Sequence, residues 1–214
     1  PDPPRKIRVV GGGPLCTIHG MLAWHLQDAP GTYAWGEVPT PVPAAGEVRI
    51  RVRASALNHM DLWLTKGLPR PRSFPHVPGC DVAGVVESVG EGVSAWAPGD
   101  EVVVNTAIVP EHALAKGIDS VLDPEMRILG EHCWGGHGEL CVVPAHQLER
   151  RPEGRTWVDS VAYPVGATTA YRLLRRARVQ AGDTVLVTGI GGGVATFALL
   201  LAIHWTSCIN DILG

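Results

Sequence analysis

The stretch Asp183–Ala202, DTVLVTGIGGGVATFALLLA, places a β-branched apolar run directly before a cluster of glycines and a second apolar run. The first run, Thr184–Thr188, predicts a buried parallel strand, and the second, Val194–Ala202, predicts a helix. A strand, a glycine turn and a helix form the first half of a dinucleotide-binding βαβ unit. The alternative is a plain tight turn that packs a helix on a sheet.

The glycine cluster brings bare backbone to the start of that helix. Residues without side chains let a pyrophosphate approach closely, and the free N–H groups of a helix N-terminus favour its negative charge. We expect the backbone N–H groups from Gly192 to Val194 to make the main contacts. The candidate cofactor-binding residues of this stretch are Gly189, Gly191, Gly192, Gly193, Val194 and Ala195.

Composition narrows the class of protein. The chain has 214 residues, of which 45% are hydrophobic and 18% charged, as in an ordinary globular protein with a sizeable core. A formal net charge of -3 gives no electrostatic reason to expect nucleic acid or an anionic membrane as a partner. No apolar run is long enough to span a bilayer. The cysteines are odd in number and scattered, which argues against a disulfide framework and predicts a cytoplasmic setting: Cys16, Cys80, Cys133, Cys141 and Cys208.

The rest of the chain divides into three parts. Residues 1–20 carry prolines and a GGG run without periodicity, and we expect a flexible extension. Residues 21–150 predict a compact barrel-like β domain with a looser, partly helical lobe at Thr106–Glu131. Residues 151–214 predict two helices and then the glycine-rich unit, with the boundary near Pro144 to Arg155. The expected strands are Met21–Leu26, Tyr33–Val38, Glu47–Ala54, Asp81–Val89, Glu101–Asn105 and Gly138–Val143, and the expected helices are Thr156–Tyr163 and Ala167–Arg178.

The strongest strand pattern is Glu47–Ala54, in which apolar and arginine residues alternate. Val48, Ile50, Val52 and Ala54 face one way, whereas Arg49, Arg51 and Arg53 face the other. The arginines predict a solvated strand face.

Five segments in order give the chain a resemblance to a known family: GEVRIRVRASALNHMDLW, PHVPGCDVAGVVESVGEGVSAWAPGDEVVV, GGHGELCVVPA, AYPVGATTAYRLL and DTVLVTGIGGGVA. They resemble the medium-chain dehydrogenase/reductase superfamily, from Met21 to about Ala202. The resemblance implies a mostly β GroES-like barrel domain followed by the beginning of an α/β Rossmann domain. It also implies hydride transfer between NAD(P)H and alcohols, aldehydes, ketones, enones or quinones.

The resemblance bears on metal as well. Zinc-dependent members of the family have a cysteine at the position of Asn58, a histidine at that of Cys80 and a further cysteine near Val165. A catalytic zinc needs three protein ligands, and here only Cys80 can bind, so no catalytic zinc is expected. The lobe lacks the four cysteines of the family's structural zinc. His132, Cys133, His137 and Cys141 contain no close CxxC-type pair, and we expect no metal there either.

The retained residues resemble the zinc-free, quinone-reductase-like branch. Asn58 and Asp61 match its N-x-x-D and are the candidate catalytic residues. The Asn58 amide both donates and accepts, which suits a carboxamide or a carbonyl oxygen near the nicotinamide. Asn58 is equally suited to cap a helix over Met60–Thr65, and Asp61 to compensate that helix's dipole. Cys80 is expected to be a buried, small apolar residue rather than a reactive thiol.

The resemblance assigns further cofactor contacts. His59 stands where relatives often have a basic residue near the pyrophosphate, although a surface histidine is the competing interpretation. Thr169 lies in a segment that resembles the family's hinge, where a threonine often contacts the nicotinamide end. Gly189, Gly192 and Ala195 follow the G-x-x-G-x-x-A spacing of the branch. The cofactor is expected to be NADP or NAD, with NADP favoured.

The implied reaction is direct hydride transfer to a small carbonyl, enone or quinone, with Asn58 or water stabilising the developing oxyanion and solvent supplying the proton. After Ala202 the chain reads IHWTSCINDILG, without the second strand and ribose-binding region of the family, so we expect a truncated cofactor domain. A homodimer is expected for a full-length form. The alternatives are a non-catalytic barrel module and, less favoured, a zinc-dependent alcohol dehydrogenase.

Overall fold

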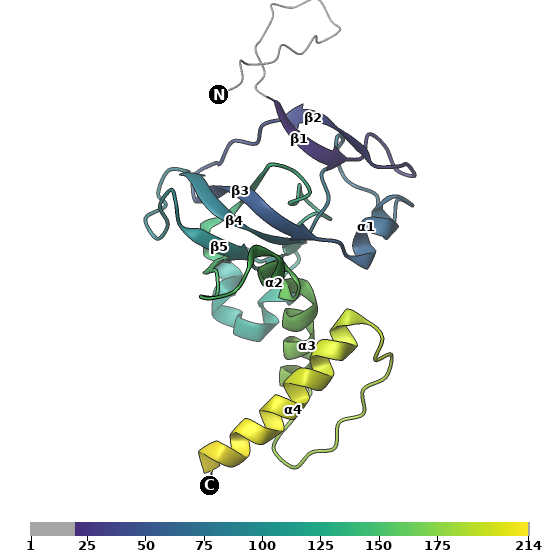
Figure 1. Ribbon diagram of the computed structural model, residues 1–214, viewed down its shortest axis with the longest axis vertical. Coiled ribbons are helices and arrows are strands. Elements are labelled where there is room, and N and C mark those ends of the chain that lie inside the picture. The colour runs from purple at the N-terminus through teal and green to yellow at the C-terminus, as the bar shows by residue number, and fades with distance from the viewer. Residues whose placement is uncertain (1–19, 214) are drawn as a thin grey trace, which may run out of the picture.

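The computed structural model describes residues 20–213, with side chains described except at positions 118 and 205–213. Figure 1 shows a β domain above a group of helices that ends in a long C-terminal helix. The expected extension over residues 1–20 lies outside the described residues, apart from Gly20, and so does Cys16.

The β domain is built on one antiparallel sheet of five strands in the order β8-β3-β4-β5-β9, with two further strand pairs beside it. Each strand expected between residues 21 and 150 is present, with ends that agree within two residues. The sheet contains β3 (Glu47–Ala56), β4 (Asp81–Val89), β5 (Glu101–Val104), β8 (Leu140–Pro144) and β9 (Leu148–Arg150); the separate pairs are β1 (Gly20–His25) with β2 (Ala34–Pro39), and β6 (Ala107–Ile108) with β7 (Arg127–Ile128).

Strand β3 shows why the sequence forms this sheet. Val48 and Ile50 are fully buried between β4 and β8, and burying such a side chain stabilises the fold by about 1.5–3 kcal/mol. The arginines of the opposite face lie outside the core, as predicted. Arg49 Nε lies 2.5 Å from a carboxylate oxygen of Glu87 on β4, and Arg51 binds the other oxygen.

Glycines allow backbone segments to cross closely beneath the hairpin of β1 and β2. Gly79 has a φ of +100°, and a Cβ there would lie 2.5 Å from the His137 ring. A Cβ at Gly130 would lie 2.7 Å from the Gly79 nitrogen, and one at Gly135 would lie 2.1 Å from the Gly79 oxygen. Gly136 also donates its N–H to the Gly79 carbonyl at 2.9 Å. We call Gly79, Gly130 and Gly135 the glycine crossing.

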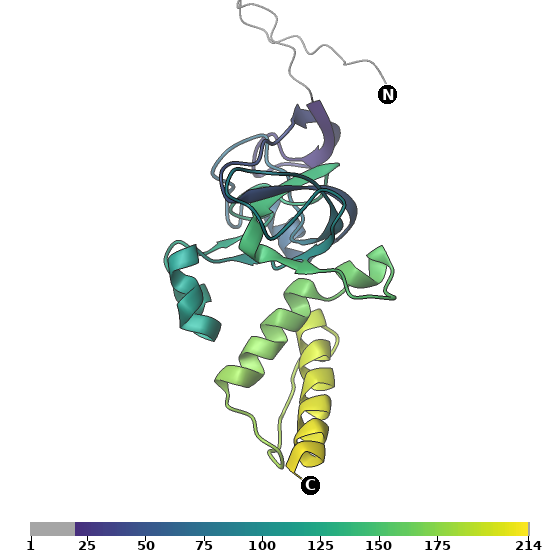
Figure 2. The same cartoon turned by 90° about the vertical axis from the view of Figure 1, so that its left-hand side faces the viewer.

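The lobe between β5 and β8 is irregular and partly helical, as the sequence predicted. Its main element is the 3₁₀ segment η1 (Glu111–Leu122), which Figure 2 shows standing apart on one side of the β domain. Lys116 Nζ lies 2.8 Å from the buried Asp123 carboxylate, and this bond lowers the pKa of Asp123 to about 2. The lobe is therefore held by an ammonium–carboxylate pair.

The C-terminal part contains only helices and loops among the described residues. Figure 2 shows α3 (Pro164–Arg176) and α4 (Gly193–Leu213) side by side, and Phe197 of α4 fits against Gly166 of α3, where a Cβ would lie 3.0 Å from its ring. Helix α3 begins three residues before the expected start because a proline suits the first helical position. No described helix is both long and apolar enough to cross a membrane. The remaining helical elements are α1 (His59–Leu64), η2 (Ala145–Gln147) and α2 (Trp157–Val161).

The predicted strand Thr184–Thr188 is wrong as secondary structure. These residues form no strand, and Leu186 is 87% exposed. A parallel strand exists through hydrogen bonds to strands beside it, and the described chain places none next to this segment. The helix that was expected to follow is present as α4, which begins at Gly193.

Candidate functional site

Asn58 is the N-cap residue of α1, as one of the two sequence interpretations predicted. Its backbone N–H donates to the Asp61 carboxylate at 2.7 Å, so Asp61 closes the first turn of the helix. The Asn58 side chain points elsewhere: its amide nitrogen donates to Asp81 at 2.8 Å and approaches the Ala56 carbonyl at 3.5 Å. The N–H groups of this amide are therefore directed into the protein.

Asp81 joins the β domain to the helical part. One carboxylate oxygen accepts from the Asn58 amide, and the other accepts from the backbone N–H of Val165 at 2.8 Å, in the first turn of α3. The carboxylate thus binds at a helix N-terminus, where negative charge is favoured. Burial raises the pKa of Asp81, while the bonds from Asn58 and Val165 lower it.

The glycine run lies next to the same end of α3. A Cβ at Gly166, one residue after Val165, would lie 3.9 Å from the Gly193 carbonyl carbon at the start of α4. The chain of contacts runs from Asn58 through Asp81 and α3 to the glycine run, so the structure brings these predicted residues into one region.

The glycines themselves are uncovered. A Cβ at Gly189, Gly191 or Gly193 would meet nothing within 4 Å, which differs from the crowded glycines of the β domain. Gly189 has a φ of +67°, which forms the turn, and the Gly192 N–H donates to its carbonyl at 2.9 Å. Of the N–H groups expected to bind pyrophosphate, that of Gly192 is thus used by the turn.

The two other predicted cofactor contacts lie on exposed helical surfaces. Thr169 is exposed on α3, and it borders a cavity of about 440 Å³ between the lobe and α3. We call this the lobe cavity; its wall includes Thr106, Gln147, Val165 and Thr169. His59 is exposed on α1, with its ring 5.2 Å from that of Trp63. The structure therefore places Thr169 near the site but leaves His59 on the α1 surface.

Sequence reasoning missed a second polar group, centred on His137. Its Nδ1 lies 2.7 Å from the Ser55 hydroxyl, and its Nε2 lies 3.4 Å from the Asp61 carboxylate. The Tyr33 hydroxyl donates to the Asp61 backbone carbonyl at 2.7 Å. The available signal was the sequence GGHGE, in which glycines flank the histidine and let its backbone pack closely. Asp61 thus belongs to this group rather than to the side of Asn58 that faces α3.

The side chains considered for metal have other roles. Cys80 is buried, as expected, and burial strongly raises the pKa of its thiol. Cys141 lies in the core, and His132 Nδ1 accepts from the Ile128 N–H at 3.0 Å. Within residues 20–213, His112, Asp123 and Glu125 form the group whose ligand atoms lie within 4.8 Å of one another, but Lys116 already binds its central carboxylate.

Comparison with known proteins identifies the family to which this chain belongs. Residues 44–153 match the family described as the alcohol dehydrogenase GroES-like domain. The chain therefore belongs to this family, within the medium-chain dehydrogenase/reductase superfamily. The match confirms the predicted fold class, a mostly β GroES-like barrel domain followed by the beginning of an α/β Rossmann domain, with the correction that the first Rossmann strand is not formed.

Three relatives are informative. The crotonyl-CoA reductase of Streptomyces collinus is 35% identical over 189 residues, which are 78% of this chain and 42% of that protein. The quinone oxidoreductase of Lama guanicoe is 31% identical over 180 residues, covering 83% and 46% of the two chains. A 2-octenoyl-CoA carboxylase reductase, solved in complex with NADP and 2-octenoyl-CoA, is 33% identical with a TM-score of 0.78, covering 87% and 50%. The chain thus spans about half the length of the relatives it matches.

Proposed function

We propose that this chain contributes the barrel and the first cofactor-binding segment of an NAD(P)-dependent oxidoreductase that transfers hydride to a carbonyl, enone or quinone without catalytic zinc. The observation that carries the proposal is the Asp81 carboxylate, which bonds to Asn58 on one side and to the α3 N-terminus on the other. This bond supports the proposal because it joins Asn58 to α3, the helix that contacts the glycine run.

The glycine run fits a dinucleotide. Its uncovered backbone leaves room for a pyrophosphate, and the first-turn N–H groups of α4 at Gly193, Val194 and Ala195 are oriented as donors for an anion. Thr169, exposed about one turn beyond Gly166, is the proposed contact toward the nicotinamide end. His59 is proposed as the basic residue near the phosphates. When bound, the reduced nicotinamide supplies the hydride.

The residues at the zinc position do not fit zinc. The Asn58 amide directs its N–H groups at Asp81 and Ala56, and Val165 offers an aliphatic side chain. Of the three positions only Cys80 carries a group that binds zinc, whereas a catalytic zinc needs three protein ligands. No step of the proposed mechanism therefore uses a metal at this position.

The geometry changes the role proposed for Asn58. Because both of its N–H groups are directed into the protein, they are not available to a substrate oxyanion. Its amide oxygen is an acceptor, which suits the N–H₂ of a carboxamide. In our proposal, Asn58 orients the cofactor and holds Asp81. Asp61 positions Asn58 by accepting from the Asn58 backbone N–H. Water donates to the developing oxyanion and supplies the proton.

The lobe cavity is the proposed place for the substrate, because Val165 and Thr169 are in its wall. Catalysis would come from holding two reactants in a fixed orientation, which contributes several kcal/mol to such transfers, about 7–11 kcal/mol in well-oriented cases. The names of the relatives support a conjugated enoyl thioester or quinone as the substrate class, and the solved NADP complex supports NADP over NAD.

Titration of the 214-residue chain with NADPH and with NADH, followed by nucleotide fluorescence, tests the proposal. We expect saturable binding that is tighter for NADPH. Gly193→Asp should weaken it by about tenfold or more, because a carboxylate there repels phosphate yet remains compatible with a helix N-terminus. Gly154→Asp, at an open surface turn, is the control and should leave affinity unchanged. If neither nucleotide saturates by about 1 mM, where binding is worth about 4 kcal/mol, the cofactor site does not work in this chain.

Two further measurements separate the alternatives. With NADPH bound, loss of nicotinamide absorbance on adding crotonyl-CoA or 1,4-benzoquinone would show the reaction. Folded chain without nucleotide binding would instead favour the non-catalytic barrel module, whose main core cluster lies within the β domain. Metal analysis that finds one tightly held zinc per chain would overturn the zinc-free assignment.

A further inference from the structure

A second cavity, of about 730 Å³, lies on the other side of the polar group around His137. It opens between the β1–β2 hairpin, the end of β3 and the segment that follows the glycine crossing. We call it the hairpin cavity; the wall residues that matter below are Trp24, Tyr33, Trp35, Asp61, His137 and Glu139. The proposed hydride transfer uses the lobe cavity and does not require this one.

Asp61 lies in the wall of the hairpin cavity, and one of its carboxylate oxygens has no hydrogen-bond partner. Its side chain is 4% exposed, and its Oδ2 accepts from the Asn58 N–H and lies 3.4 Å from His137 Nε2. Its Oδ1 is buried and has no hydrogen-bond partner. Buried carboxylate oxygens are rarely left unpaired, because desolvation without a donor is costly. Because Asp61 is part of the wall of the hairpin cavity, its carboxylate is the one that a donor on a ligand would approach from the cavity.

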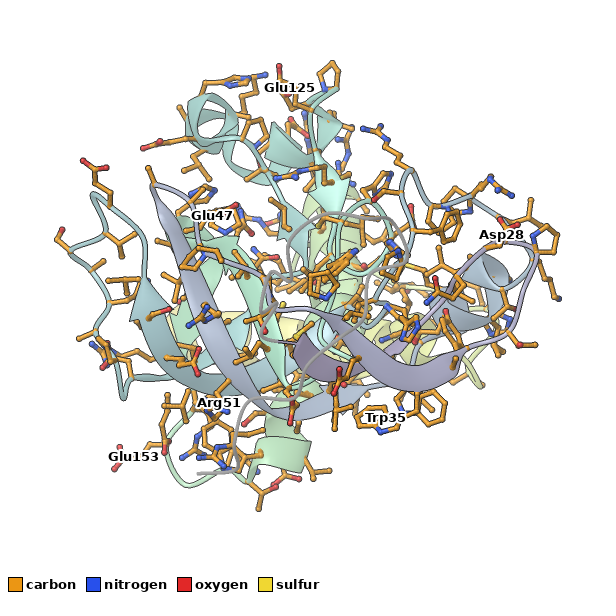
Figure 3. All side chains as sticks on the ribbon, turned by 90° about the horizontal axis from the view of Figure 1, so that it is seen from above. Asp28, Trp35, Glu47, Arg51, Glu125 and Glu153 are labelled. Carbon is orange, nitrogen blue, oxygen red and sulfur yellow. The ribbon has the colours of Figure 1, made fainter. Side chains whose placement is uncertain are left out.

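Aromatic rings form the outer wall of the same cavity. The rings of Trp24 and Trp35 have centroids 5.6 Å apart and are inclined at 57°, so they form a corner. Figure 3 shows Trp35 at the outer edge of the hairpin. Tyr33 is fixed by its bond to the Asp61 carbonyl. Aromatic faces attract cations as well as apolar groups, and a corner of two indoles suits both.

The charges around the hairpin cavity favour a cation. Asp61 and Glu139 contribute two carboxylates to its wall, and Arg53 contributes one guanidinium. The Glu139 carboxylate accepts from the Leu22 N–H at 2.8 Å, which holds it in place. Burial and, secondarily, the Asp61 charge raise the pKa of Tyr33, so its phenol is neutral and adds no charge to the wall. A ligand that donates with a positive charge therefore fits better than one that donates with a neutral hydroxyl.

We propose that the hairpin cavity binds a small organic ammonium compound with an apolar body. The ammonium pairs with the Asp61 carboxylate, and the body lies in the corner formed by Trp24 and Trp35. This site is additional to the proposed oxidoreductase site and needs no dinucleotide.

Calorimetric titration of the 214-residue chain with 2-phenylethylammonium chloride tests the proposal directly. We expect saturable binding to one site per chain. The neutral isostere 2-phenylethanol should bind about tenfold more weakly or worse, because a hydrogen bond between two charged groups is replaced by one with a neutral donor. Equal affinities for the two compounds, or no saturation by the ammonium, would overturn the proposal.

Variants locate the site. Asp61→Asn retains an acceptor for the Asn58 N–H but replaces the free carboxylate oxygen with an amide group, and it should weaken ammonium binding by about tenfold. Asp159→Asn is the matched control: Asp159 closes the first turn of α2 with Thr156 in the same way, away from the cavity, and affinity should not change. Unchanged affinity in a folded Asp61→Asn chain would refute the site.

A second pair of variants serves if Asp61→Asn does not fold. Trp35→Ala removes one side of the corner and should weaken binding severalfold. Trp63→Ala removes an indole of similar exposure, 50% against 52%, from the surface of α1 outside the cavity and should have no effect. Equal effects of the two tryptophan variants would contradict the assigned position.

Discussion

Strand β3 and the segment Thr184–Thr188 both contain β-branched, apolar residues, but only β3 forms a strand. In β3, Val48 is fully buried because β4 and β8 hydrogen-bond to both edges of the strand. In the second segment no neighbouring strand is described, and Leu186 stays in solvent. An apolar, β-branched run therefore indicates a preference, and the partner strands decide whether a strand forms.

Replacing one side chain in each region should give the largest contrast. Ile50→Ala removes a fully buried side chain from the sheet and should lower the free energy of unfolding by about 2–5 kcal/mol. Leu186→Ala removes a side chain that is already hydrated and should change it by less than about 0.5 kcal/mol. Urea unfolding followed by circular dichroism measures both. A loss above about 1 kcal/mol for Leu186→Ala would show that the segment packs as a strand in solution.

Glycines give a second contrast, within the β domain. Gly135→Ala places a methyl group about 2.1 Å from the Gly79 oxygen, which only a backbone shift can relieve. We expect a loss of about 1–3 kcal/mol or more in urea unfolding. Gly92→Ala meets no atom within 4 Å but has a φ of +81°, and it isolates the smaller cost of strain alone. Equal losses for the two variants would mean that the crossing is looser than described.

The stability that Asp81 contributes by joining the β domain to α3 should depend on pH. Burial raises the pKa of the Asp81 carboxyl above its ordinary 3.8, so the folded chain holds this proton more tightly than the unfolded chain. The tighter binding of this proton stabilises the folded chain. This stabilisation is fully present below the ordinary pKa and is lost as the pH rises through the raised pKa of the folded chain. Asp81→Asn does not titrate; its single amide oxygen keeps one of the two hydrogen bonds, and the loss of the other is the same at every pH.

The stability of Asp81→Asn relative to the natural chain should therefore increase with pH across that window, by at most about 1.4 kcal/mol per pH unit. Unfolding of both chains at several pH values measures this difference. A relative stability that instead falls with rising pH would mean that the ionised carboxylate is favoured in the folded state.

The smallest effect is expected in the glycine run. Gly193→Ala fits into open space at the start of α4 and replaces a poor helix former with the best one. We expect the free energy of unfolding to be unchanged or to rise by up to about 1 kcal/mol. A loss of more than about 1 kcal/mol would place a covering segment over this glycine.

The strands of the β domain could be predicted because alternation and turn residues act locally. The pattern within Glu47–Ala54 or Asp81–Val89 is enough to indicate a strand that packs against a core. The outcome at Thr184–Thr188 could not be predicted, because a strand forms there only beside partner strands, and the described chain places none next to this segment. Local capping likewise identified Asn58 as the N-cap of α1, but the direction of its amide is set by Asp81, which lies 23 residues away in the sequence.

The group around His137 could not be predicted from the sequence either, because it also depends on contacts between distant segments. Ser55, Asp61 and His137 come from three segments, and only the folded backbone shows that they touch. Asp61 was identified as important, but its two carboxylate oxygens turned out to have different surroundings. One closes a helix turn, whereas the other is buried without a hydrogen-bond partner.

The glycine crossing has a consequence for how the sequence can change over time. Each of Gly79, Gly130 and Gly135 would bring a Cβ within 3 Å of another segment's atoms, so a replacement at one cannot be relieved by shrinking a neighbouring side chain. In a saturation library selected only for folding, we expect these three positions to tolerate glycine alone, while Gly191 and Gly193 accept many residues. Variation at the glycine run would then be limited by ligand binding rather than by the fold.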